Sequence, residues 1–191
     1  MQNIKDIIST NIAVQQKLLG DDKLIKTISD VVATIINAYR IGKKILAAGN
    51  GGSAADAQHF IAEYVGRFYY DRPALAGIAL STDTSILTAI GNDYGYEDVF
   101  ARQLQANGNE GDVFVGFSTS GNSANIVKAL EVCKDKRIIS VGFTGAKPAK
   151  MDALCNYIIK APSTDTPRIQ ECHELIEHTI CQLVEEAIFP K

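Results

Sequence analysis

The chain has few cysteines and no long apolar run. Its 191 residues include four cysteines, Cys133, Cys155, Cys172 and Cys181, and no two of them form a CxxC pair. We therefore expect reduced thiols in a cytoplasmic protein, with neither a disulfide framework nor a cysteine zinc site. The N-terminal segment MQNIKDIIST lacks the apolar core of a signal peptide. The most apolar helical stretch, VVATIINAY, is short and interrupted by polar residues, so no membrane association is expected.

The chain also has no excess of basic residues. It contains 19 Lys and Arg against 22 Asp and Glu, which gives a net charge of -3. No basic run is longer than the pair Lys43-Lys44. Binding to nucleic acid needs clustered positive charge, so it is excluded as an expected function. With 46% hydrophobic residues, 15 Gly and 5 Pro, the composition is typical of one globular domain over residues 1–191.

Apolar periodicity predicts an α/β fold. Apolar residues at three-to-four spacing over 3–19 and 21–41 predict an N-terminal helical hairpin, an extension over 1–41 that precedes an α/β core over 42–191. Short apolar runs that alternate with helical patterns then favour a parallel sheet covered on both faces, a doubly wound fold with five strands. The expected strands are 43–49, 74–80, 112–118, 137–144 and 155–161. The expected helices lie near 53–68, 84–90, 96–106, 122–134 and 167–187.

Two of the expected strands end in turns with unusual composition. The first turn is GNGGS at 49–53 and the second is STSGNS at 118–123. In a doubly wound sheet, ligands bind beyond the carboxyl ends of the strands. Both turns lead into a helix, whose free N–H groups and dipole favour an anion, and small hydroxyls suit the oxygens of a phosphate monoester. The plainer alternative is that these residues only form turns and cap helices.

Other phosphate motifs fit less well. The segment Gly49-x-Gly51-x-x-Ala54 matches a relaxed dinucleotide fingerprint, but no acidic residue closes the following strand at the required distance. No Walker loop, GxxxxGK[ST], is present. A single phosphorylated small molecule is the expected ligand.

Groups capable of proton transfer or metal binding follow the first turn and recur near the C-terminus. His59 and Glu63 are four residues apart on one expected helix and therefore face the same way. A second set, Gln170, His173, Glu174 and His178, lies within about two and a half turns of the last expected helix. Histidine and glutamate suit proton transfer near neutral pH and can also ligate a divalent metal. Such an i, i+4 pair is also common as a simple surface hydrogen bond.

Four stretches together resemble the phosphoheptose isomerases, enzymes of the sugar isomerase (SIS) fold. They are GNGGSAADAQHFIAEYVGRF, GND at 91–93, STSGNSANIVKA at 118–129 and RIQECHELIEH at 168–178. They occur in the family's order over nearly the whole chain. The resemblance implies a flavodoxin-like SIS fold and an aldose–ketose isomerase acting on sedoheptulose 7-phosphate, the first step in making nucleotide-activated heptose for surface glycans. It also implies one zinc ion per subunit and a homotetramer with sites at subunit interfaces.

The resemblance also implies roles for individual residues. Glu63 and His178 would be the catalytic acid/base pair, and which is the base stays open. The metal ligands would be His59, Glu63, Gln170 and His178. The substrate would be held by Asn50, Gly51, Gly52, Ser53, Glu63, Asn92, Asp93, Ser118, Thr119, Ser120, Ser123 and Gln170, with the STSGNS turn on its phosphate.

Two features depart from this pattern. Gln170 and His178 are eight residues apart, about 12 Å along an ideal helix, so one ion could meet both only if the helix start is irregular or both side chains reach inward. Pro167 stands where some family members have an acidic residue.

A rival interpretation is a non-catalytic SIS module that binds phosphosugars, of the type that associates with a bacterial replication initiator. Such proteins lack the residues matching Glu63 and His178. Both are present here, which favours the enzyme.

Overall fold

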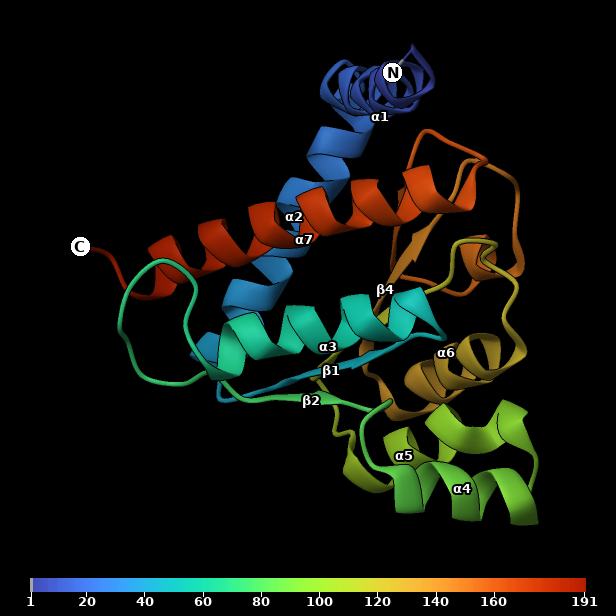
Figure 1. Cartoon of the computed structure of the whole chain (residues 1–191). Helices are drawn as coiled ribbons and strands as arrows, with labels where there is room; N and C mark the ends of the chain where they lie inside the picture. The colour runs from blue at the N-terminus through green and yellow to red at the C-terminus, as the bar shows by residue number, and fades with distance from the viewer. Residues whose placement is uncertain (1) are drawn as a thin grey trace.

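The computed structural model describes residues 2–191 and shows five strands and seven α-helices (Figure 1). The strands are β1 (Ile45–Ala48), β2 (Gly77–Ala79), β3 (Val113–Phe117), β4 (Ile139–Thr144) and β5 (Tyr157–Lys160). The helices are α1 (Gln2–Leu19), α2 (Asp22–Arg40), α3 (Gly52–Val65), α4 (Thr84–Asp93), α5 (Val99–Asn107), α6 (Ala124–Lys136) and α7 (Thr166–Ile188). Two short 3-10 helices, η1 (Tyr96–Asp98) and η2 (Lys150–Ala153), complete the elements.

The five strands form one parallel sheet in the order β2-β1-β3-β4-β5. This is the flavodoxin-like order, so the predicted doubly wound α/β fold is confirmed. The direction of winding reverses between β1 and β3. A ligand site is expected beyond the carboxyl ends of those two strands, because the connections leave them toward opposite faces of the sheet.

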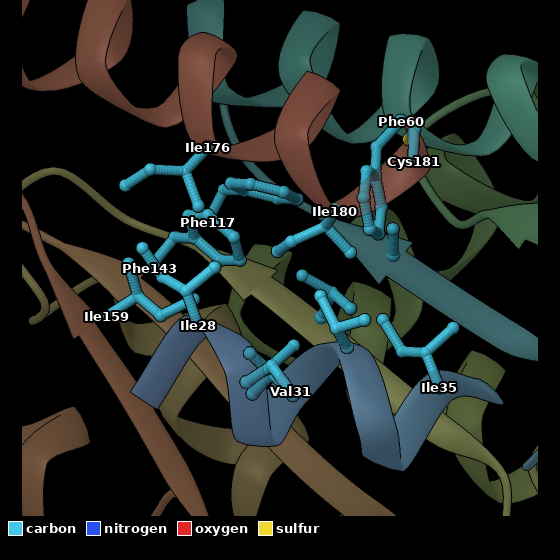
Figure 2. Close-up of a cluster of buried hydrophobic side chains, with 14 of the residues drawn as sticks. Ile28, Val31, Ile35, Phe60, Phe117, Phe143, Ile159, Ile176, Ile180 and Cys181 are labelled. Carbon is cyan, nitrogen blue, oxygen red and sulfur yellow. The ribbon is translucent and has the colours of Figure 1, made fainter. Parts of the chain in front are cut away.

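Both faces of the sheet are covered, as the continuous apolar strands predicted. Alternate residues of β1 enter different cores: Ile45 and Ala47 pack beneath α2, α3 and α7, whereas Leu46 and Ala48 pack against α5 and α6. This alternation follows from the two-residue period of a strand. Figure 2 shows the first core, where side chains of α2, α3 and α7 meet those of β3, β4 and β5. The sheet is therefore a rigid platform under α3 and α7.

Some boundaries differ from those predicted. Helix α3 ends at Val65 and not near 68, because Gly66 closes the helix and the chain turns into a loop. Helix α4 continues to Asp93, so the GND segment forms its last turn. No helix among residues 2–191 is both long and apolar enough to cross a membrane.

The N-terminal helices form where expected but do not pack along their length as a hairpin. In Figure 1, α1 is seen almost end-on while α2 lies across the view, so the two helices cross. Only Val14 and Leu18 of α1 are buried. Four of its isoleucines are at least half exposed, namely Ile4, Ile7, Ile8 and Ile12. The apolar periodicity of α1 thus predicts a helix correctly, but its apolar face is not covered within this chain.

His173 fixes α7 over the end of β4. Its side chain is fully buried, its Nε2 lies 3.2 Å from the Thr144 carbonyl oxygen, and its ring packs edge-on against Phe143. Nε2 therefore carries the proton and donates to that carbonyl. Burial lowers the pKa of His173 to about 4, with the Thr144 hydrogen bond opposing the shift. The residue is a neutral core histidine.

Because His173 is buried and neutral, we expect the folded chain to lose stability at low pH. Between its ordinary pKa of about 6.5 and its folded pKa of about 4, the unfolded chain binds a proton that the folded chain does not, so stability falls as pH falls. We expect His173→Phe to remove this dependence. The stability advantage of the original chain over the variant should shrink by up to about 1.4 kcal/mol per pH unit across that window. Urea unfolding of both proteins at several pH values measures it, and parallel pH profiles would contradict the assignment.

Candidate active site

The two sequence-predicted turns lie side by side at the reversal point of the sheet. The GNGGS turn follows β1 and leads into α3, and the STSGNS turn follows β3 and leads into α6. Because β1 and β3 are neighbours, both turns and both helix N-termini are at the same edge. A reciprocal amide pair joins them: Asn50 Nδ2 donates to Asn125 Oδ1 at 2.9 Å, and Asn125 Nδ2 donates to Asn50 Oδ1 at 2.8 Å. The role of Asn125 was not predicted from the sequence.

The first turn requires its glycines. Gly51 has a φ of +58°, which disfavours residues with a Cβ. A Cβ at Gly49 would lie 2.1 Å from the Ser53 carbonyl oxygen, and one at Gly52 would lie 2.4 Å from Gln170 Nε2. A larger residue is therefore excluded by the backbone at Gly49 and disfavoured by φ at Gly51, whereas at Gly52 it would require the Gln170 side chain to move.

The hydroxyls of the second turn converge. Ser118 Oγ lies 2.9 Å from Ser123 Oγ and 3.4 Å from Ser120 Oγ. Ser123 occupies the N-cap position of α6, but its side chain makes no capping hydrogen bond. The capping alternative therefore does not account for this serine, whose hydroxyl instead joins the cluster. Thr119 and Ser120 also line a cavity of about 250 Å³ beside the turn. A phosphate could accept hydrogen bonds from these hydroxyls and from the start of α6.

Imidazole and carboxylate groups meet between α3 and α7. His59 Nε2 lies 3.0 Å from Glu63 Oε1, while His59 Nδ1 lies 2.7 Å from Glu174 Oε1. His178 Nε2 lies 3.3 Å from the same Glu174 oxygen, and the two histidine rings are edge to face with centroids 5.0 Å apart. The predicted residues His59, Glu63 and His178 are thus brought together from two helices. All four side chains keep some contact with solvent, so a ligand can reach them.

Gln170 contacts the start of α3. Its amide packs against Gly52. Helix α7 is regular from Thr166 onward with Pro167 in its first turn, so an irregular helix start does not shorten the separation from His178. A shared ion would therefore need the Gln170 side chain to reach inward. Glu174 lies between them, one turn from each, and its i, i+4 spacing was visible in the sequence.

Two other predicted substrate residues lie at the end of α4. Asn92 and Asp93 are exposed in the last turn of α4, and Asn92 Nδ2 donates to Asp93 Oδ1 at 2.8 Å. Among residues 2–191, neither makes a hydrogen bond to the GNGGS or STSGNS turn.

The donor set fits a divalent metal. His59, Glu174 and His178 each offer one ligand atom, and these atoms all lie within 4.8 Å of one another. Imidazole nitrogens with carboxylate oxygens suit zinc. Glu63 joins this group through its contact with His59. Chemically, the arrangement can hold a cation and move protons at one end while the two turns hold an anion at the other.

A buried ion pair holds α3 against α7. The Arg72 guanidinium donates to Glu185 Oε1 at 2.8 Å and to the carbonyl oxygens of Glu63 and Tyr64 at 2.7 and 2.9 Å. The side chains of Arg72 and Glu185 are 2% and 1% exposed. The loop after α3 thereby ties the backbone of the predicted catalytic glutamate to the C-terminal helix. Sequence patterns gave no indication of this pair.

Comparisons with known proteins agree with this geometry. The SIS domain family matches residues 13–145. A phosphoheptose isomerase of Aneurinibacillus thermoaerophilus is 63% identical over 97% of this chain and 94% of its own length. Phosphoheptose isomerase 2 of Campylobacter jejuni is 61% identical over 98% and 94%.

A solved structure gives the same result. The phosphoheptose isomerase of Neisseria gonorrhoeae superposes with a TM-score of 0.90 at 38% identity, covering 97% of this chain and 98% of its own. The chain therefore belongs to the SIS domain family and, within it, to the phosphoheptose isomerases.

Proposed function

We propose that this chain is a sugar-phosphate isomerase that converts sedoheptulose 7-phosphate to D-glycero-D-manno-heptose 7-phosphate. The observation that carries the proposal is that Glu63 on α3 and His178 on α7 are joined through His59 and Glu174, in a fold whose two glycine- and serine-rich turns lie at one edge of the sheet. Relatives more than 60% identical over nearly the whole chain are phosphoheptose isomerases, which favours an enzyme over a binding module.

The reaction needs two proton-transfer groups. A base removes a proton from C1 of the ketose, an enediol forms, and a proton returns at C2 while the C2 carbonyl becomes a hydroxyl. Glu63 and His178 approach from α3 and α7, so they can serve different carbons of one substrate. Glu174 Oε1 lies 2.7 Å from His59 Nδ1 and 3.3 Å from His178 Nε2, so its carboxylate faces both rings.

The two turns position the substrate. Its phosphate is far from C1 and C2, so contacts with Ser118, Thr119, Ser120 and Ser123 contribute orientation and not bond making. The sugar would be held on the other side of the β1–β3 junction by Asn50, Gly51, Gly52 and Ser53. Two helix N-termini directed at one edge support this division of labour.

We also propose that zinc binds here, with His59, Glu63, Gln170 and His178 as ligands. When bound, zinc supplies Lewis-acid polarisation of the substrate oxygens. The convergence of both histidines with carboxylates supports a cation at this position.

Two further properties belong to the proposal. A homotetramer with shared sites would cover the exposed isoleucines of α1 and would let α4, which has no buried residue, deliver Asn92 and Asp93 to a neighbouring subunit's turns. A cytoplasmic location suits the four free cysteines, and the product would enter synthesis of nucleotide-activated heptose for surface glycans.

Direct assay tests the activity. The protein incubated with sedoheptulose 7-phosphate should form the aldose, which NMR resolves from the ketose. We expect Glu63→Gln, which keeps the shape but removes the base, to lower turnover by about a hundredfold or more with little change in thermal stability. Glu131→Gln, the same exchange at an exposed site on α6, is the matched control. Turnover near that of the original chain in folded Glu63→Gln would refute the role of Glu63.

The phosphate site is tested at Ser120. If its hydroxyl holds the phosphate, Ser120→Ala should weaken binding of sedoheptulose 7-phosphate by about 1–3 kcal/mol, the range for a hydrogen bond to a charged group. A substrate analogue without the phosphate should bind both proteins weakly and almost equally. Calorimetric titration of two proteins with two ligands completes the cycle. An equal loss for both ligands would move the phosphate to the GNGGS turn.

The zinc ligand set is tested at Gln170. Gln170→Ala should lower zinc affinity by about tenfold or more, as measured by competition with a chelating dye. Gln182→Ala, on the same helix and bonded to Glu186 at the surface, should leave it unchanged. Unchanged affinity in Gln170→Ala would show that Glu174, and not Gln170, completes the ligand set.

A further inference from the structure

A second group of acidic side chains lies next to the histidines. It comprises Asp56 on α3 with Glu174 and Glu177 on α7, and one carboxylate oxygen of each lies within 4.8 Å of the other two. Glu174 also belongs to the group with His59 and His178. The two groups therefore share one side chain. The first offers two imidazoles, whereas the second offers only carboxylates.

Glu177 is the unusual member. Its side chain is 1% exposed, and among residues 2–191 neither of its carboxylate oxygens has a hydrogen-bond partner. Asp56 Oδ2 is also buried without a partner in the same range. Among residues 2–191, no lysine or arginine forms an ion pair with Asp56, Glu174 or Glu177. Burying an ionised carboxylate without compensation is costly, so either a proton or a cation must compensate Glu177.

We propose that Asp56, Glu174 and Glu177 bind a second divalent cation of the oxygen-preferring class, Mn²⁺ or Mg²⁺, next to the proposed zinc site. Carboxylate donors without imidazole or thiolate suit these ions, which complete their coordination with water. Glu174 Oε1 lies 2.7 Å from His59 Nδ1 and 3.3 Å from His178 Nε2, so the two sites would be adjacent. Glu177 is then a metal ligand and not an uncompensated buried acid.

This inference goes beyond the proposed function, because none of its three ligands is in the predicted catalytic pair. Its test therefore measures binding and not turnover. Protein stripped with a chelator is reloaded with about one equivalent of Zn²⁺ per chain and titrated with Mn²⁺, and electron paramagnetic resonance counts the bound ion. We expect about one Mn²⁺ per zinc-loaded chain.

Two nearly isosteric variants test the ligands. Glu177→Gln and Asp56→Asn should each weaken Mn²⁺ binding by roughly tenfold or more while retaining zinc and the circular dichroism of the original chain. Glu186→Gln, the same exchange at an exposed position of α7, is the control and should bind Mn²⁺ normally.

Three results would overturn the proposal. The first is no Mn²⁺ bound beyond the zinc at millimolar concentration. The second is a Glu177→Gln variant that binds Mn²⁺ as tightly as the original chain, or one that loses zinc and Mn²⁺ together. The third is an infrared band of a protonated carboxyl in zinc-loaded protein saturated with Mn²⁺ that Glu177→Gln removes, since a proton would then compensate Glu177. A protein without isomerase activity that still binds Mn²⁺ would refute the proposed isomerase function but not the second cation site.

Discussion

The contact between α3 and α7 is the constraint on which the site depends. His59 and Glu63 lie near one end of the sequence and His178 near the other, and only this contact brings their side chains together. It is fixed at one end by the buried pair Arg72–Glu185, which ties the backbone of Glu63 to α7. Leaving one member of such a pair buried alone costs about 3–5 kcal/mol. This ion pair therefore helps to fix the two helices that carry the predicted acid and base.

The anion site has a different physical origin, because it is determined locally. Each turn follows a buried strand and leads into a helix, so the strand fixes its position and the helix supplies free N–H groups. The two turns become neighbours because β1 and β3 pair at the reversal of the sheet. The amide pair of Asn50 and Asn125 then locks one turn to the other. Local sequence thus determines each turn, and the pairing of β1 with β3 places the two turns side by side.

This difference explains what the sequence could and could not predict. Apolar runs and glycine-rich turns depend on residues close in the chain, so the strands, the helices and the serine turn were found correctly. The burial of Glu177 and His173 depends on which face of α7 meets the sheet. Their spacing with the buried residues Ile176 and Ile180 carried that information, but charged residues on a helix are usually solvated. The crossing of α1 over α2 depends on packing partners, which apolar periodicity alone does not specify.

The charges of the site explain how a sugar phosphate would be oriented in it. The carboxyl groups of Asp56, Glu174 and Glu177 lie between α3 and α7, and whatever negative charge they carry would repel a phosphate. The hydroxyls and N–H groups at the start of α6 attract it, and they carry no formal negative charge. In the proposed site, the phosphate of an anionic substrate would therefore bind at the STSGNS turn, with the neutral sugar end toward Glu63 and His178. Cations bound among the carboxylates would reduce the repulsion without reversing the preference, because the turn still offers the hydrogen bonds that a phosphate needs. The same acidity that would bind metal would thus also select the orientation in which C1 and C2 face the proton-transfer pair.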